Sequence, residues 1–485
     1  MMLLRRLFRI KRIDSELNPG EHLLNRVLGP LDLVLLGIGG IVGAGIFALV
    51  GTAAAGDAAR PGAGPALIVS FVLTGIACGF TALCYAEFAS LVPISGSAYT
   101  YAYITLGEIV AWIIGWDLVL EYAVGNVAVA VSWSGYFCEF LRGFGLEFPR
   151  WLATDLRTAL ASPEILAAAP RVLGVPLVFN LPAVFIVTVL TVLLVVGIKE
   201  SAWFNAVMVG IKLLVLAFFV VIGMYYVKSE NWRPFAPNGW AGIQAGAAVV
   251  FFAFIGFDAV STAAEECRNP RRDLPIGILG SLAICTIIYV VVAVVLTGMI
   301  PWRELNTAEP LSVAMRVVNQ NWAAGIVAFG SLVAHTAVLL VFQLGQPRIL
   351  YSMARDGLLP SALAKTHPRF KTPYLATILT GLFVAGGSAL ASLEEMADLC
   401  NIGTLSAFLI VSAGILVLRR RQPHQRRGFR TPWVPWVPLL GILACLWLMF
   451  GLPWTAWIRF AVWLAAGIVF FALYGYRHSR LAQDV

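Results

Sequence analysis

Residues 36–47, LGIGGIVGAGIF, decide how this 485-residue sequence folds. Five glycines fall within the nine residues 37–45, in the middle of an apolar run that starts near residue 31. A glycine inside a helix costs about 1 kcal/mol relative to alanine. The cluster therefore predicts an unwound segment in a helix, or else a surface of small residues on which other helices pack closely.

The composition around this stretch predicts an all-α integral membrane protein. The chain is 60% hydrophobic and only 12% charged, whereas soluble domains are roughly 25% charged. A bilayer core of ~30 Å needs roughly 20 mostly apolar residues per helix. On this basis we expect twelve transmembrane helices, near residues 31–50, 65–90, 98–128, 180–197, 204–227, 242–265, 275–300, 322–354, 374–390, 396–418, 433–451 and 456–476.

The positive charges predict the orientation of the chain in a cytoplasmic membrane. The net charge is +8, and the basic segments lie on one side of the predicted spans, at the N-terminal tail, 268–273, 355–373, 419–430 and 477–480. By the positive-inside rule both termini are cytoplasmic, which requires an even number of crossings. Four arginines in the connection 141–178 weaken the contrast. We expect no nucleic-acid partner, and the N-terminus lacks the features of a signal peptide.

A second irregular stretch, 251–260 (FFAFIGFDAV), lies in the sixth predicted span. If spans 1–5 (31–227) and 6–10 (242–418) are two repeats, this stretch matches the glycine cluster in position. Paired interruptions in two matching helices indicate a transporter binding site near the membrane midplane. The remaining units are a cytoplasmic N-terminal tail (1–30), two further spans (433–476) and a cytoplasmic C-terminal tail (477–485).

Six stretches together carry a family resemblance: GIGGIVGAGIF (37–47), YAEFASLVPISGSAYTYAY (85–103), GWDLVLEYAVGNVAVAVSWSGY (115–136), FFAFIGFDAVSTAAEE (251–266), RNPRRDLPIG (268–277) and GQPRILYSMARDGLLP (345–360). The chain resembles the amino acid–polyamine–organocation superfamily of transporters, in its cationic-amino-acid-transporter branch and of the bacterial type. The resemblance implies a leucine-transporter-type 5+5 inverted repeat plus two C-terminal helices, with spans 1 and 6 broken. It also implies import of L-amino acids by alternating access, with no enzymatic activity, cofactor or metal.

The resemblance assigns the two ends of a bound amino acid to the broken backbone. Its carboxylate is placed on the N–H groups of Gly43, Ala44 and Gly45, because helix N-termini carry free donors. Its ammonium is placed on carbonyl groups around four residues, Ile41, Phe252, Ala253 and Ile255. Phe254 is expected to cover the substrate as a gate, and the alternative is that its ring packs against a neighbouring helix.

Charged residues inside the spans are the candidates for coupling, because each is costly in the membrane. The resemblance places Lys212 where sodium-driven relatives hold a sodium ion, which predicts a proton-coupled, sodium-independent carrier in which Lys212 bridges span 5 to broken span 1. A static structural cation is the alternative. Glu121, with Asp117 four residues earlier, is a candidate proton relay, a site for a basic side chain, or an ion-pair partner.

Four further residues complete the predicted site. Asp258 follows the break in span 6 and is expected to cap or brace it, and Glu87 and Arg268 are expected to brace the inner gate. His335 in span 8 is predicted to shorten the side-chain pocket, and the alternative is an ordinary core histidine. This interpretation favours a small neutral amino acid such as alanine over a cationic one, and it leaves an amino acid or amine exchanger open. The predicted partners are the substrate, a proton and membrane lipid, and a sterol or a small single-helix subunit is compatible with the sequence.

Overall fold

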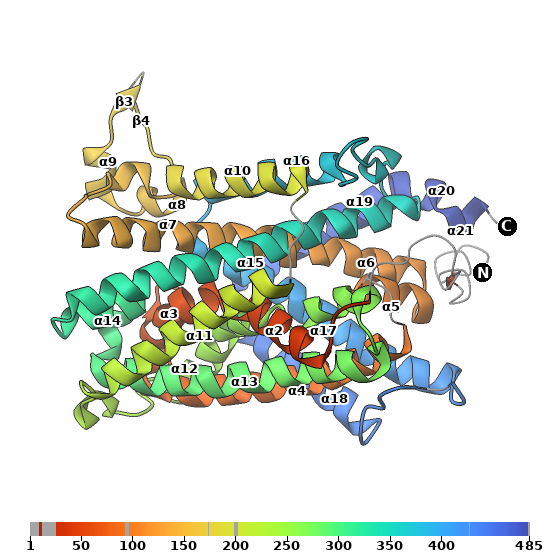
Figure 1. The fold of residues 1–485 in the computed structure, drawn as a ribbon, viewed down its shortest axis with the longest axis horizontal. Helices are drawn as coiled ribbons and strands as arrows, with labels where there is room; N and C mark the ends of the chain where they lie inside the picture. The colour runs from red at the N-terminus through yellow and green to blue at the C-terminus, as the bar shows by residue number, and fades with distance from the viewer. Residues whose placement is uncertain are drawn as a thin grey trace.

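The computed structural model describes residues 9–11, 26–92, 97–172, 174–197, 202–425 and 427–483. Long helices run along the longest axis of the molecule (Figure 1), and the first and last described segments meet at one end of it, where Arg9 donates to the carbonyl of Leu481. The predicted N-terminal tail, residues 1–30, and the connection 91–97 fall largely outside the described residues, as do residues 484 and 485 of the C-terminal tail.

Eight continuous stretches of the described chain are helical, long and apolar enough to cross a membrane, and a bent pair forms a ninth. The bent pair joins α2 (Pro30–Ile41) to the π-helical turn η2 (Gly45–Leu49) and α3 (Val50–Ala55). The others contain α4 (Leu67–Leu91), α6 (Glu108–Val119) with η4 (Leu120–Val124) and α7 (Gly125–Gly143), α11 (Ala202–Met224), α12 (Gly239–Val250) with η7 (Phe251–Phe254) and η8 (Asp258–Glu266), α13 (Pro270–Met299), α15 (Asn321–Arg355), α17 (Leu393–Arg421) and α19 (Trp454–Phe470).

Three shorter apolar helices lie at the remaining predicted spans: α10 (Leu181–Val196), α16 (Tyr374–Leu390) and α18 (Trp436–Phe450). The helical, membrane-spanning character of the fold therefore agrees with the sequence. The count of twelve crossings and the 5+5 repeat remain predictions, because the three short helices do not by themselves reach the length of a bilayer crossing.

The third span differs from its prediction of 98–128. Residues 97–105 form a separate helix, α5 (Ser97–Thr105), and the span itself runs from Glu108 to Gly143. Gly107 separates the two with φ 108° and ψ 175°, a conformation open to glycine but strained for other residues. Hydropathy alone did not reveal this turn, because residues 97–105 contain no charged residue that would mark a boundary before the span.

Smaller elements lie in the connections. A hairpin of β1 (Gly56–Asp57) and β2 (Arg60–Pro61) follows α3, and a second of β3 (Arg171–Val172) and β4 (Val175–Pro176) follows α8 (Leu156–Leu160) and α9 (Pro163–Ala168). The short helix α14 (Pro310–Val317) precedes α15. Helices α8, α9 and α14 and the second hairpin lie at the end opposite α21 (Arg480–Gln483) (Figure 1).

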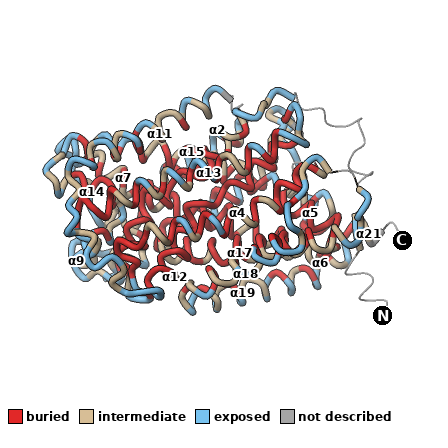
Figure 2. Tube along the Cα trace, turned by 90° about the horizontal axis from the view of Figure 1, so that it is seen from below, coloured by how far each residue is buried: buried red, intermediate tan, exposed pale blue. Residues whose placement is uncertain are grey.

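The broken helices form the centre of the bundle. Every residue from 37 to 54 is buried. Of the 18 most apolar consecutive residues in each span, 94% are buried in the α12 span and 22% in the α19 span. Figure 2 shows buried residues concentrated on the inner helices. The outer helices expose apolar side chains such as Leu214 and Val462, which is expected of surfaces that face lipid.

Candidate functional site

The first span is interrupted at the glycine cluster. Helix α2 ends at Ile41, Val42 is extended with φ −78° and ψ 103°, and the axis turns by 47° before the helix resumes at Gly45. The next backbone hydrogen bond in the chain runs from Phe47 N–H to the carbonyl of Gly43. The N–H groups of Gly43, Ala44 and Gly45 therefore begin a helical segment, where no intrahelical acceptor exists, as the prediction for the substrate carboxylate requires.

The sixth span is interrupted next to it. After η7, Ile255 is extended and Gly256 has a φ of +114°, and the chain becomes helical again at Asp258. Phe252, Ala253, Phe254 and Ile255 are all buried. The interruption thus falls within the stretch that the sequence singled out.

The two interruptions touch backbone to backbone. A Cβ atom on Gly45 would lie 2.2 Å from the Cα of Ala253, and one on Gly256 would lie 2.8 Å from the carbonyl carbon of Gly40. Other glycines of the cluster meet other helices, since a Cβ on Gly37 would collide with Ser281 and one on Gly43 with Val338. Both sequence interpretations of the glycines therefore hold, unwinding at the break and close packing on either side.

Side chains from other helices bind the carbonyl groups exposed at the end of α2. The Nζ of Lys212 donates to the carbonyl of Gly39 at 2.6 Å, and the hydroxyl of Tyr289 donates to that of Ile41 at 3.0 Å. Lys212 is fully buried. The expected contact between span 5 and broken span 1 is thus present, whereas its role in coupling remains a prediction.

Phe254 lies in a buried aromatic cluster beside the break. Its ring centroid is 6.2 Å from that of Phe71 and 5.5 Å from that of Tyr289. This geometry matches the alternative in which the ring packs against neighbouring helices. A gating movement remains a prediction, and it would have to separate Phe254 from the tyrosine that binds Ile41.

Glu121 and Asp258 form a buried acidic pair. Glu121 lies in the π-helical turn η4, a local widening of the helix that is frequent at functional sites. Its carboxyl group lies beside that of Asp258, and the hydroxyl of Thr404 is a further neighbour. Within the described chain, no group lies in a position to form a well-aligned hydrogen bond with either carboxyl group. Asp258 therefore faces span 3, and Glu121 interacts with it rather than with Asp117.

His335 lies beside the second half of broken span 1. Its Nδ1 is 2.6 Å from the carbonyl of Ser331, and its Nε2 is 2.7 Å from the hydroxyl of Ser132. Because a carbonyl only accepts, Nδ1 must carry the proton, and in the neutral ring Nε2 then accepts from Ser132. The ring centroid is 5.9 Å from that of Phe47. His335 is thus a satisfied core histidine that also borders the break.

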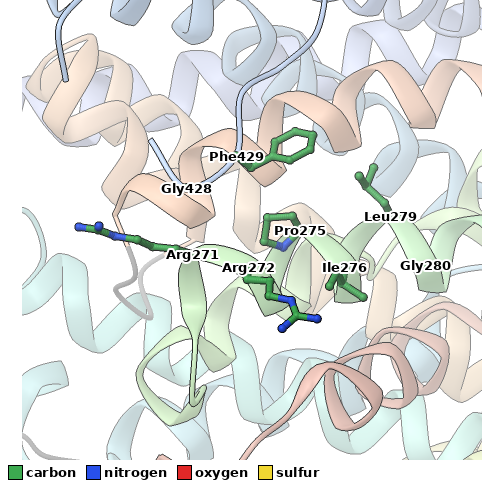
Figure 3. A pocket seen from close by; sticks show the side chains of 8 residues that line it. All are labelled: Arg271, Arg272, Pro275, Ile276, Leu279, Gly280, Gly428 and Phe429. Atoms are coloured by element: carbon green, nitrogen blue, oxygen red, sulfur yellow. The ribbon is translucent and has the colours of Figure 1, made fainter. Parts of the chain in front are cut away.

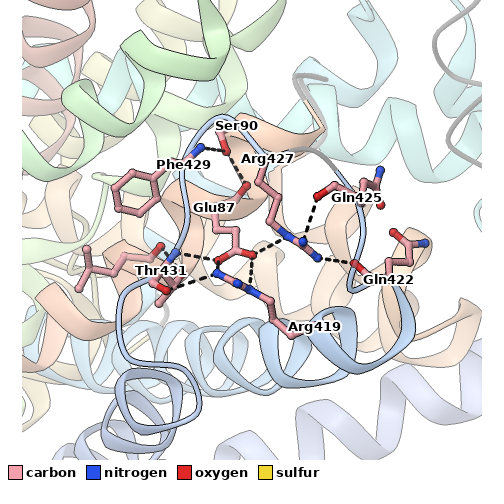
Figure 4. A network of polar contacts seen from close by, with 9 residues as sticks. Glu87, Ser90, Arg419, Gln422, Gln425, Arg427, Phe429 and Thr431 are labelled. Carbon is pink, nitrogen blue, oxygen red and sulfur yellow. Dashed lines mark hydrogen bonds and ion pairs between the residues drawn. The ribbon is translucent and has the colours of Figure 1, made fainter.

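Glu87 and Arg268 do not share one network. Glu87 is fully buried and is bound by Arg419 at 2.8 Å, by Arg427 at 2.9 Å and by the backbone N–H of Thr431 (Figure 4). Arg268 has an exposed side chain, and its backbone N–H donates to the carbonyl of Leu28. Glu87 therefore braces α4 against the end of α17, while Arg268 holds the chain before α2 through its backbone.

Sequence reasoning missed the tyrosines that complete the site. Tyr289 binds the carbonyl of Ile41, and the hydroxyl of Tyr136 donates to the carbonyl of Phe47. Both side chains are fully buried. A tyrosine inside an apolar span is the only signal that could have found them, because a buried hydroxyl needs a partner.

Comparison with known proteins identifies the family of the chain. The family described as amino acid permease matches residues 28–474. The chain is 49% identical to the branched-chain amino acid permease of Bacillus subtilis (strain 168), covering 98% of this chain and 99% of that protein. It is 45% identical to the methylthioribose transporter of the same organism, covering 98% and 99%.

A plant relative is more distant. The chain is 39% identical to the vacuolar cationic amino acid transporter 4 of Arabidopsis thaliana, over 86% of this chain and 68% of that protein. All three relatives are transporters and none is an enzyme. The chain belongs to the amino acid permease family, within the amino acid–polyamine–organocation superfamily and as a bacterial-type member of its cationic-amino-acid-transporter branch.

Proposed function

We propose that this protein imports neutral L-amino acids across the cytoplasmic membrane by alternating access, driven by protons and independently of sodium. The observation that carries the proposal is the meeting of the two interruptions, at Gly45 against Ala253 and at Gly40 against Gly256. Free N–H groups on one side and unwound carbonyls on the other are the complements of a carboxylate and an ammonium.

Lys212 supports sodium independence. Its ammonium donates to the carbonyl of Gly39, one turn before the break, where a fixed positive charge performs the task of a bound cation. The adjacent carboxyl groups of Glu121 and Asp258 supply a second place for a proton, because neighbouring buried carboxyl groups are stabilised by sharing one.

His335 supports a neutral substrate. Both ring nitrogens already have partners in the core, so the ring offers no acceptor to a basic side chain. The relative named as a branched-chain amino acid permease extends the proposal from alanine to larger aliphatic amino acids. A cationic substrate is the second candidate, favoured by the Glu121 and Asp258 carboxyl groups, which have no cationic partner within the described chain, and by the relative named as a cationic amino acid transporter.

Uptake into proteoliposomes tests the proposal. The panel contains alanine, valine, leucine, isoleucine, arginine, lysine and methylthioribose, each with an inward proton gradient, with and without sodium. We expect proton-driven accumulation of the aliphatic amino acids, unaffected by sodium and lost in Lys212→Met. Lys228→Met is the matched control, because Lys228 is exposed in a connection.

The alternatives give different results. Uptake that occurs only against preloaded internal amino acid would identify an exchanger. A requirement for sodium would contradict the role of Lys212. Preferential uptake of arginine and lysine would indicate that the substrate side chain binds beside Glu121 and Asp258 rather than beside His335.

A further inference from the structure

A groove lies between the start of α13 and the connection from α17 to α18, away from the two interruptions. It has a volume of about 440 Å³ and is lined by Arg271, Arg272, Pro275, Ile276, Leu279, Gly280, Gly428 and Phe429. In Figure 3 the two arginines and Leu279 lie toward opposite ends of the lining, with Pro275 between them and Phe429 above. Neither the substrate site nor the Glu87 network uses these arginines.

The lining residues along α13 change from charged to apolar, as a phospholipid changes from its head group to its acyl chains. Arg271 and Arg272 lie in the first turn, and Leu279 follows eight residues later, which is ~12 Å along the helix axis. Helix α13 is long and apolar enough to cross a membrane. The charged end of the groove is therefore at the membrane boundary, and its apolar floor of Pro275, Ile276 and Leu279 extends toward the hydrocarbon.

The positive charge in the groove comes from Arg271 and Arg272. Arg271 and Arg272 are exposed, and neither takes part in any ion pair within the described residues. Asp273, the next acid along the chain, is buried. The two guanidinium groups point away from each other in Figure 3, and because both side chains are exposed they can rotate toward one phosphate.

The opposite wall of the groove is held in place. A Cβ atom on Gly428 would lie 2.5 Å from the Cβ of Arg271, so the connection runs directly against α13. The backbone N–H of Phe429 donates to Ser90 of α4 at 3.0 Å, and the residues on either side, Arg427 and Thr431, are bound to Glu87 (Figure 4). The groove is therefore formed before any ligand enters, which limits the entropy lost on binding.

From the two exposed arginines, the apolar floor and the fixed wall, we propose that this groove binds an anionic phospholipid, with its phosphate at Arg271 and Arg272 and an acyl chain along Pro275, Ile276 and Leu279. Basic grooves at the membrane boundary attract acidic head groups, and an apolar floor selects a lipid over a soluble anion. The proposal does not rest on the transported substrate or on the coupling ion.

Native mass spectrometry of the full-length protein tests the proposal. The protein in detergent is incubated with phosphatidylglycerol or with phosphatidylcholine of the same acyl chains, and bound lipids are counted without any amino acid present. We expect retention of phosphatidylglycerol over phosphatidylcholine. In Arg271→Gln/Arg272→Gln we expect binding about 30-fold weaker, from two basic groups near the membrane surface.

The control variant is Lys365→Gln/Arg369→Gln, which removes the same charge from the connection after α15. Its phosphatidylglycerol binding should match that of the unaltered protein. Equal loss in both double variants, or no preference for phosphatidylglycerol, would overturn the proposal. Displacement of the lipid by millimolar inorganic phosphate would overturn it as well, because the groove would then be a site for a soluble anion.

Discussion

At the scale of single residues, glycine is required in the first span because neighbouring atoms leave no space for a side chain, and not only because glycine favours an unwound backbone. Gly45 lies so close to the backbone of Ala253 that a methyl group has no room, and backbone atoms cannot move aside as a side chain can. Gly79 in α4, in contrast, has no atom within 4 Å of the position that a Cβ would take. Comparing substitutions at Gly45 and Gly79 therefore distinguishes the effect of contact at the site from the general effect of replacing a glycine in a helix.

Replacing Gly45 by alanine should abolish transport. The added methyl group would push η2 away from η7 and separate the two interruptions, and overpacking of this kind typically costs about 1–3 kcal/mol. Uptake and the thermal unfolding midpoint in detergent are the measurements. Gly79→Ala should keep full uptake and a slightly higher midpoint, since alanine favours the helix by about 1 kcal/mol. Normal transport by Gly45→Ala would show that the interruptions need not touch.

At the scale of elements, one buried carboxylate joins three parts of the chain. Glu87 of α4 accepts from Arg419 at the end of α17 and from Arg427 and Thr431 in the following connection. A second junction lies at the opposite end, where Glu139, near the C-terminal end of α7, pairs with Arg142 and with Arg316 of α14. Glu309, the residue before α14, lies beside this pair.

Replacing Glu87 by glutamine should destabilise the protein strongly. The side chain of Arg427 is only 1% exposed, so losing its partner leaves a buried charge without compensation. Breaking a buried ion pair from one side typically costs about 3–5 kcal/mol. Thermal unfolding in detergent measures this, with Glu395→Gln as the control, because Glu395 is one-quarter exposed and its ion pairs are partly solvated. Equal effects of both substitutions would contradict a special role for the Glu87 junction.

Glu309 should make stability fall as the pH rises. Burial and, next, the carboxylate of Glu139 raise the pKa of Glu309 from an ordinary 4.5 to about 7. The folded state then holds a proton that the unfolded state has released, so stability is greatest below pH ~4.5 and is lost between there and pH ~7. The shift corresponds to roughly 3 kcal/mol at most.

Unfolding midpoints measured across this pH window provide the test for Glu309. In Glu309→Gln the part of the fall in the unfolding midpoint that is due to this group should disappear. At the acidic end of the window the midpoint of the variant should be close to that of the unaltered protein. Glu304→Gln is the control, from the same connection. A fall that persists unchanged in Glu309→Gln would assign the titration to other groups.

At the scale of the whole molecule, the arrangement of the two ends agrees with an even number of crossings. Residues 9–11 and 480–483, the first and last that the structure describes, lie together at one end of the bundle (Figure 1), joined by a hydrogen bond from Arg9 to the carbonyl of Leu481. The chain before α2 is bonded there to residues 266–268, and the connection 422–431 packs against the start of α13. The basic segments at 268–273 and 419–430 therefore share one end of the molecule, which the positive-inside rule assigns to the cytoplasm.

Labelling of single cysteines should confirm this orientation. Six of the seven native cysteines are buried, so replacing Cys138 with alanine gives a protein whose native cysteines react little with maleimide. In intact cells a membrane-impermeant maleimide should label Leu146→Cys, three residues after the end of α7, and not His424→Cys. After permeabilisation it should label both. Labelling of His424→Cys in intact cells would reverse the orientation and contradict the proposed import of substrate toward the basic end.

The sequence by itself determined the helical membrane fold, the family and the interruption of the first span. Hydropathy and the cost of glycine in a helix are local properties, so they can be read along the chain. Only the tertiary structure decided where span 3 begins, that Glu121 meets Asp258, and that Glu87 binds Arg419 and Arg427 rather than sharing a network with Arg268. Those pairs lie more than 100 residues apart, and a residue's own neighbours in sequence do not specify which distant helix packs beside it.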